Sequence, residues 1–119
     1  MAAKIENNFG DIIISKNVIA TIAGAVANNS YGVVGMAMRN TTDGIVSLLK
    51  SGNLAKGIKI EIEDNAIIID MHIIVQYGVN ITAICDSIMH NVSYQVTEMT
   101  GFEVKDVNVY VESMRVASE

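Results

Sequence analysis

The sequence contains a single cysteine, Cys85, and no proline among its 119 residues. A lone cysteine cannot close a disulfide within the chain, which indicates a reducing compartment. Residues 1–8 lack the apolar core and the small-residue cleavage site of a signal peptide. No apolar run approaches the roughly 20 residues that a membrane-spanning helix needs. We therefore expect a cytoplasmic protein without direct membrane insertion, whose contact with a membrane would come through a partner or a surface patch.

Clustered basic residues are also absent. Eight lysines and arginines are scattered among thirteen aspartates and glutamates, and the formal net charge is −5. Nucleic-acid-binding proteins neutralise phosphates with clustered cations, so we expect no nucleic-acid partner. The sequence GVVG at residues 32–35 matches the GxxG of the KH nucleic-acid-binding domain, but it opens an apolar stretch and has no basic flanks. We interpret these glycines as a tight turn with close packing.

Half of the residues are apolar and 18% are charged. A chain of this length forms one domain, and the composition provides enough apolar surface to offset the entropy of ordering. Because a small domain has a high ratio of surface to volume, part of its apolar surface stays exposed unless another chain covers it. The composition therefore favours self-association, and we expect a homo-oligomer.

The apolar spacing predicts two main helices. The first follows Ser15, whose hydroxyl can accept a hydrogen bond from the first turn, and it ends at residues 28–32. The second follows Asn80, another good N-cap, and ends at Gly101. Its residues at steps of three and four form one apolar stripe, which comprises Ile81, Ile84, Cys85, Ile88, Val92, Val96 and Met99.

Alternating apolar residues predict the strands. They are expected at residues 11–14, 33–39, 58–63, 66–77 and 107–111. A two-residue turn at residues 64–65 would join the third and fourth of these as a hairpin. That turn fixes the register, whose pairs are Ile62–Ile67, Ile60–Ile69 and Ile58–Met71 on one face and Lys59–Asp70 on the other.

One mixed sheet with the two main helices packed on one face is the simplest way to bury these stripes. We therefore expect an α/β fold of the α+β type, in the order strand, helix, strand, uncertain helix, strand, strand, helix, strand. Residues 9–117 would form its single domain, and residues 1–8 a flexible N-terminus. The sequence does not decide the structure of residues 40–57, which are compatible with a short helix capped by Thr42 or Asp43 and with a mobile contact segment.

The polar residues form no convincing catalytic constellation. Asp86 and His90 lie four residues apart on the second helix, which is typical of a solvated surface pair. Cys85 belongs to the apolar stripe and His90 lies almost opposite, so we expect no Cys–His nucleophile. Asp70 and His72 share a strand face and form the alternative hypothesis, a small-molecule or metal-binding domain. Our main expectation is a protein that is not an enzyme and has no cofactor or metal.

Several motifs follow one another in a characteristic order. They are GDIIIS at residues 10–15, VIATIA at 18–23, YGVVG at 31–35, GIKIEIE at 57–63, VQYGVNI at 75–81, MTGFEV at 99–104 and VNVYV at 107–111. In order and spacing, from about residue 9 to 117, they resemble the bacterial alkaline shock, or envelope stress response, protein family. The chain has Tyr31 and Thr82 where that family usually has prolines, which need not alter the fold because proline there mainly restricts the unfolded chain.

The resemblance implies a small cytoplasmic protein that is linked to alkaline or cell-envelope stress and acts through protein contacts. No catalytic residue or cofactor comes with the family. The outer sheet face carries the candidate contact residues Ile68, Ile74 and Tyr110, with Glu61 and His72 at the margin. In the alternative, residues 40–57 cover this face. We expect a non-enzymatic, self-associating module, with a membrane-associated protein as a candidate partner that would hold it near the cell envelope.

Overall fold

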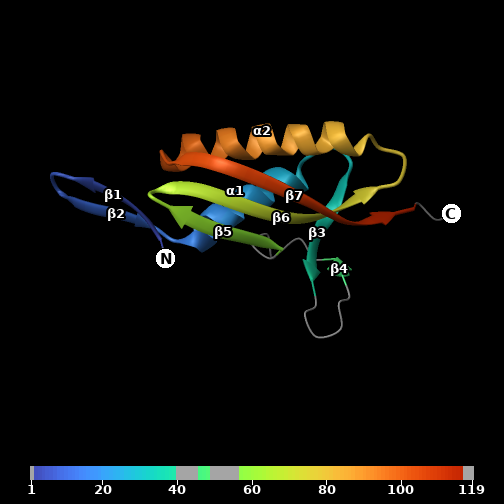
Figure 1. The fold of residues 1–119 in the computed structure, drawn as a ribbon, viewed down its shortest axis with the longest axis horizontal. Coiled ribbons are helices and arrows are strands. Elements are labelled where there is room, and N and C mark those ends of the chain that lie inside the picture. The colour runs from blue at the N-terminus through green and yellow to red at the C-terminus, as the bar shows by residue number, and fades with distance from the viewer. Residues whose placement is uncertain (1, 40–45, 49–56, 117–119) are drawn as a thin grey trace.

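The computed structural model describes residues 2–39, 46–48 and 57–116, which form two helices and seven strands. Along the chain these are β1 (Ala3–Asn7), β2 (Gly10–Ile14), α1 (Lys16–Asn28), β3 (Val33–Arg39), β4 (Val46–Leu48), β5 (Ile58–Glu63), β6 (Ala66–Gln76), α2 (Ile81–Thr100) and β7 (Glu103–Arg115) (Figure 1). The expected mixture of two helices with mixed-direction strands is confirmed.

β6 is the central strand of the main, five-stranded sheet. β7 pairs with it in parallel along one edge, from Ala66 to Gln76. The other edge is shared, because β5 pairs antiparallel with the first half of β6 and β3 pairs antiparallel with its last part. β4 adds to β3 at the outside of the sheet. A parallel pair needs a crossover connection, and α2 supplies it between β6 and β7.

The β5–β6 hairpin has the register that the sequence predicts, in all four expected pairs. Its two-residue loop consists of Asp64 and Asn65, with φ angles of 51° and 64°. Positive φ at both loop positions matches the twist of the flanking strands. The loop therefore fixes which β6 residues face the helices and which face the other way.

The hydrophobic core lies between the sheet and the two helices, on the face where β6 contributes Ile67, Ile69, Met71, Ile73 and Val75, all fully buried. α2 packs Ile88, Val92 and Val96 on it, whereas α1 contributes Ile19 and several small residues. Both predicted N-caps are confirmed: Ser15 Oγ accepts from the Val18 amide at 3.4 Å and Asn80 Oδ1 from the Ala83 amide at 3.1 Å. The predicted stripe of α2 is wrong at its end, since Met99 is 65% exposed.

The N-terminal segment differs from the expectation. Ala3–Asn7, expected to be flexible, is strand β1, and it pairs with β2 in a separate two-stranded sheet. The expectation of a single sheet is therefore wrong. Alternation of Lys4, Ile5 and Glu6 with a turn after Asn7 favours a hairpin once β2 provides the partner strand. Figure 1 shows this hairpin, called the arm from here on (residues 3–14), projecting beyond the end of the main sheet.

The described part of segment 40–57 differs from the expected short helix. Val46–Leu48 form β4 and pair with β3, instead of belonging to a short helix. A short helix is marginal in water, and the unpaired edge of β3 offers three residues a backbone partner. Thr42 and Asp43, the expected caps, lie outside the described residues. Whether the segment covers the outer face or makes a mobile contact stays a prediction.

Candidate functional site

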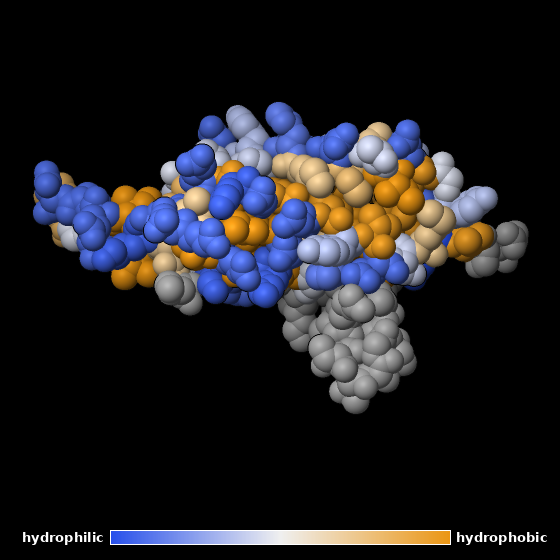
Figure 2. All heavy atoms as spheres, viewed as in Figure 1, coloured by the Kyte–Doolittle hydropathy of each residue, from blue (hydrophilic) through white to orange (hydrophobic). Residues whose placement is uncertain are grey.

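Three neighbouring strands bring the candidate contact residues to one face of the sheet. Glu61 on β5 is the register partner of Ile68 on β6, and His72 on β6 is the register partner of Tyr110 on β7. Because side chains alternate along β6, Ile68 and His72 point away from the buried face. Glu61, Ile68, His72 and Tyr110 are called the outer-face patch from here on. Figure 2 shows that the strands in front of α1 carry apolar and hydrophilic residues side by side.

Ile74 shares this face but is only 7% exposed. Its expected role as an accessible contact residue is therefore wrong. Tyr110, by contrast, is 46% exposed, and Ile68 is half-buried. The accessible part of the patch is thus centred on Tyr110, His72 and Ile68.

His72 is held by two neighbours on β7. Its ring stacks on that of Tyr110 with centroids 4.8 Å apart and an interplanar angle of 16°. Its Nδ1 lies 2.6 Å from Glu112 Oε2, and since a carboxylate only accepts, Nδ1–H is the donor. The side chains of His72 and Glu112 are 23% and 14% exposed, so this bond is partly shielded from water. The imidazole is therefore fixed as one wall of the patch.

β7 has a bulge at Glu112, the residue that bonds His72. The register passes from Val111, opposite Ile73, to Ser113, opposite Ile74, which leaves Glu112 as the extra residue. An extra residue breaks the strict alternation of faces and redirects the side chain. Sequence alternation alone assigns Glu112 to this face but does not predict the bulge or the bond to His72.

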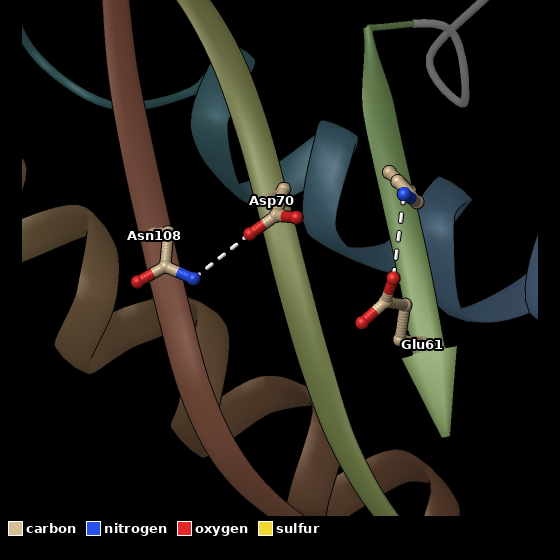
Figure 3. Close-up of polar contacts among 4 residues, drawn as sticks. Glu61, Asp70 and Asn108 are labelled. Carbon is tan, nitrogen blue, oxygen red and sulfur yellow. Dashed lines mark hydrogen bonds and ion pairs between the residues drawn. The ribbon is translucent and has the colours of Figure 1, made fainter. Parts of the chain in front are cut away.

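Asp70 has a different partner from the predicted one. Lys59 and Asp70 are opposite in the register, as expected, but the Lys59 ammonium lies 3.3 Å from Glu61 on its own strand. The Asp70 carboxylate instead accepts a 2.8 Å hydrogen bond from Asn108 Nδ2, as Figure 3 shows. Asp70 thus turns toward β7 in the direction away from Glu61.

This arrangement offers no support to the alternative of a metal site at Asp70 and His72. Each of the two side chains already has a separate polar partner. Structural and catalytic metal sites need three or more converging protein ligands. Within residues 2–39, 46–48 and 57–116, no group of three or more histidines, cysteines or carboxylates is placed to hold a metal ion.

The thiol of Cys85 is a poor nucleophile. Partial burial raises its pKa above the ordinary value of 9.0, and the neighbouring Asp86 carboxylate raises that pKa further. A raised pKa leaves less thiolate at neutral pH, and the thiolate is the reactive form.

Asp86 and His90 are both exposed on α2. Their position agrees with the interpretation of a solvated surface pair.

The arm carries exposed apolar residues that the sequence analysis missed. Phe9 is fully exposed, Ile13 is 65% exposed and Ile12 is 49% exposed. The base of the arm is anchored, because Ala3 is fully buried and Ile5 packs against the core. A hairpin interpretation of residues 3–14 would have found this feature, with Asn7 and Asn8 as the turn signal.

The part of the chain that the structure describes contains no helix long and apolar enough to cross a membrane.

The chain is 38% identical over 119 residues to YloU, an uncharacterized protein of Bacillus subtilis, with 99% of both chains covered. It is 36% identical to an uncharacterized protein of Streptococcus pyogenes serotype M6, covering 100% of this chain and 99% of the other. A stress response regulator gls24 homolog of Streptococcus pyogenes serotype M3 is 26% identical, over 92% of this chain and 62% of that protein.

A family profile described as having a cell envelope-related function matches residues 4–116, which is nearly the whole described chain. The match includes the arm, the sheet with its outer-face patch, and both helices. The resemblance seen in the sequence motifs is thereby confirmed, and the protein belongs to the alkaline shock protein 23 family.

Proposed function

We propose that this protein is a non-enzymatic, self-associating interaction module with a role in the cell-envelope stress response. The family description supports the link to the envelope, and the name of the streptococcal relative, a stress response regulator homolog, supports the link to stress. In this proposal the protein acts in the cytoplasm, and a membrane-associated protein partner holds it near the envelope.

The observation that carries the self-association is the exposed arm. A two-stranded hairpin is marginally stable by itself in water, yet this one presents Phe9, Ile12 and Ile13 to solvent. Ile12 and Ile13 are adjacent on β2, so they face opposite sides of the hairpin. Full burial of such a side chain contributes roughly 1.5–3 kcal/mol. A second copy that covers the arm would therefore gain stability from both of its faces.

The outer-face patch is the second contact surface in this proposal. It combines an accessible tyrosine, a half-buried isoleucine and a carboxylate within three neighbouring strands. Aromatic residues with a polar end are favoured at protein interfaces because they contribute both apolar area and a hydrogen-bonding group. Tyr110 is already stacked on His72, so its side chain would lose little further conformational entropy when a partner contacts it.

The test is size-exclusion chromatography with light scattering over a wide range of protein concentration. We expect the molar mass of the wild type to grow above that of one chain as concentration rises. The double variant Phe9→Ser, Ile13→Ser should stay near the mass of one chain, because it removes the exposed apolar area and leaves the anchors Ala3 and Ile5. Tyr77→Ser is the control, since Tyr77 is 65% exposed and lies outside the arm.

Circular dichroism should show the same folded spectrum for all three proteins. A wild type that stays monomeric at every concentration would contradict self-association. If the arm variant associated as strongly as the wild type, the arm would be excluded as the contact. In that case the outer-face patch would become the remaining candidate.

A further inference from the structure

A groove of about 690 Å³ lies between α1 and α2. Its walls come from the two helices and from residues 29–31 that follow α1. The helix residues that face the sheet, such as Ala23 and Val92, are not part of the lining. The groove therefore opens on the helical side of the molecule, away from the outer-face patch. Its volume falls within the range of roughly 300–1,000 Å³ that is usual for small-molecule sites.

None of the described residues that line the groove carries a charged side chain. This is notable in a chain with 21 charged residues, eight basic and thirteen acidic. An ionic ligand would lose its hydration in such a groove without gaining a partner of opposite charge. The complementary ligand is therefore an uncharged one.

Amide and hydroxyl groups supply the polar part of the lining. Four polar side chains line the groove without a hydrogen bond to another described residue: Asn29, Tyr31, Tyr94 and Gln95. Asn91 donates to Ser87 Oγ at 3.3 Å, which leaves its carbonyl oxygen as an acceptor. Amides offer both donors and acceptors, and this matches the hydroxyl group, which also has both functions.

Two aromatic rings accompany these amides. Tyr31 is 86% exposed and Tyr94 is 58% exposed, and they come from different elements of the groove. A tyrosine ring offers a flat apolar face and loses little conformational entropy on binding. The C–H faces of a pyranose ring are flat and apolar as well, whereas its edge carries hydroxyl groups. Half-buried Ile22 and Val26 add apolar surface to the groove.

We propose that the groove between α1 and α2 binds an uncharged saccharide. A sugar ring stacks on Tyr94 or Tyr31, and the amides of Asn29 and Gln95 bond its hydroxyl groups. This site is separate from the arm and from the outer-face patch, so it does not depend on the self-association proposed above.

The experiment is an NMR titration of the ¹⁵N-labelled full chain with two neutral probes, cellotriose and triacetylchitotriose. We expect saturable shifts of backbone amides in residues 21–31 and 87–99 with at least one of them. Deacetylated chitotriose, which is cationic, should bind at least tenfold more weakly than its acetylated form. Comparison with the corresponding monosaccharides identifies the source of the ligand, because a preference for the trisaccharide indicates a glycan chain and equal binding a free sugar.

Tyr94→Ala should weaken binding at least tenfold, because it removes one stacking surface from an exposed position and leaves the core intact. The matched control is Tyr77→Ala, whose tyrosine is 65% exposed and does not line the groove, so this variant should bind like the wild type. Absence of saturable groove shifts with both neutral probes would overturn the proposal. Equal effects of the two tyrosine variants would overturn it too. Loss of self-association in Tyr94→Ala, without sugar shifts in the wild type, would assign the groove to a chain–chain contact instead.

Discussion

Gly32 joins α1 to β3 with a φ of +86°, in the left-handed region that favours glycine. Its carbonyl accepts a 2.9 Å hydrogen bond from the Gln76 amide, which ties the turn to the end of β6. A Cβ at this position would overlap Ile84 Cδ1 and lie 3.2 Å from Val79 Cγ1. The motif YGVVG therefore has a structural reason at its first glycine, as the interpretation of a tight, closely packed turn expects.

Gly32→Ala should destabilise the protein more than Gly78→Ala, and chemical denaturation measures both. Gly78 has a similar φ of +96°, but a Cβ there would meet no atom within 4 Å. The conformational strain of about 1–2 kcal/mol is therefore common to both variants. Gly32→Ala should cost about 1 kcal/mol more, because buried Ile84 must shift. Equal losses of unfolding free energy would show that the contact with Ile84 has no energetic weight.

At the scale of the element, the β5–β6 turn controls the register of the central strand. Asn65 has a φ of 64°, so Asn65→Gly should raise the free energy of unfolding by about 0.5 kcal/mol, while Asn65→Ala should lower it by about 1 kcal/mol. Equilibrium urea unfolding of the two variants and the wild type provides the measurement. Shifts of the same sign in both variants would mean that positive φ at this position is not what limits the turn.

The elements that the sequence predicts correctly depend on local signals. Ser15 and Asn80 are caps because their side chains reach amides three residues away. The β5–β6 register follows from alternation around a two-residue turn, and it places Glu61, Ile68 and His72 on one face. Such signals are complete within about ten residues, so no tertiary information is needed to interpret them.

The features that were missed depend on contacts between distant parts of the chain. β7 extends over residues 103–115 instead of 107–111. Bulges at Lys105 and Glu112 interrupt the alternation of apolar residues that marks a strand in the sequence, but pairing with β6 continues beyond both bulges. The bond from His72 to Glu112 spans 40 residues and joins β6 to the bulged residue of β7. Ile74 is only 7% exposed although it lies on the same face as half-buried Ile68 and His72, and alternation along β6 does not reveal this burial.

At the scale of the whole molecule, the proposed surfaces occupy separate places. The arm projects from one end, the outer-face patch lies on the sheet, and the groove lies between the helices (Figure 1). Substitution at one surface should therefore leave the others intact, because sites without shared partners have nearly independent effects. This separation allows a protein contact on the sheet to be tested without changing the arm or the groove.

Ile68→Lys should weaken association while preserving the fold, whereas Ile74→Lys should strongly destabilise the protein. Ile68 is half-buried at the patch, and a lysine there can extend its ammonium into water. Ile74 is 7% exposed, so a lysine there would bury an unpaired charge at a cost of about 3 kcal/mol or more. Thermal unfolding measures the stability of each variant, and light scattering measures the association of those that fold.

Val18→Lys is the control, because it introduces the same charge at a 47% exposed position on α1. It should associate like the wild type, since the change in net charge from −5 to −4 lowers the general repulsion between copies only slightly. Ile68→Lys and Val18→Lys with equal association would exclude the outer-face patch from the contact between copies. Reduced association in Ile68→Lys alone would instead place a protein contact on the face formed by β5, β6 and β7, where the stacked His72 and Tyr110 present a rigid surface.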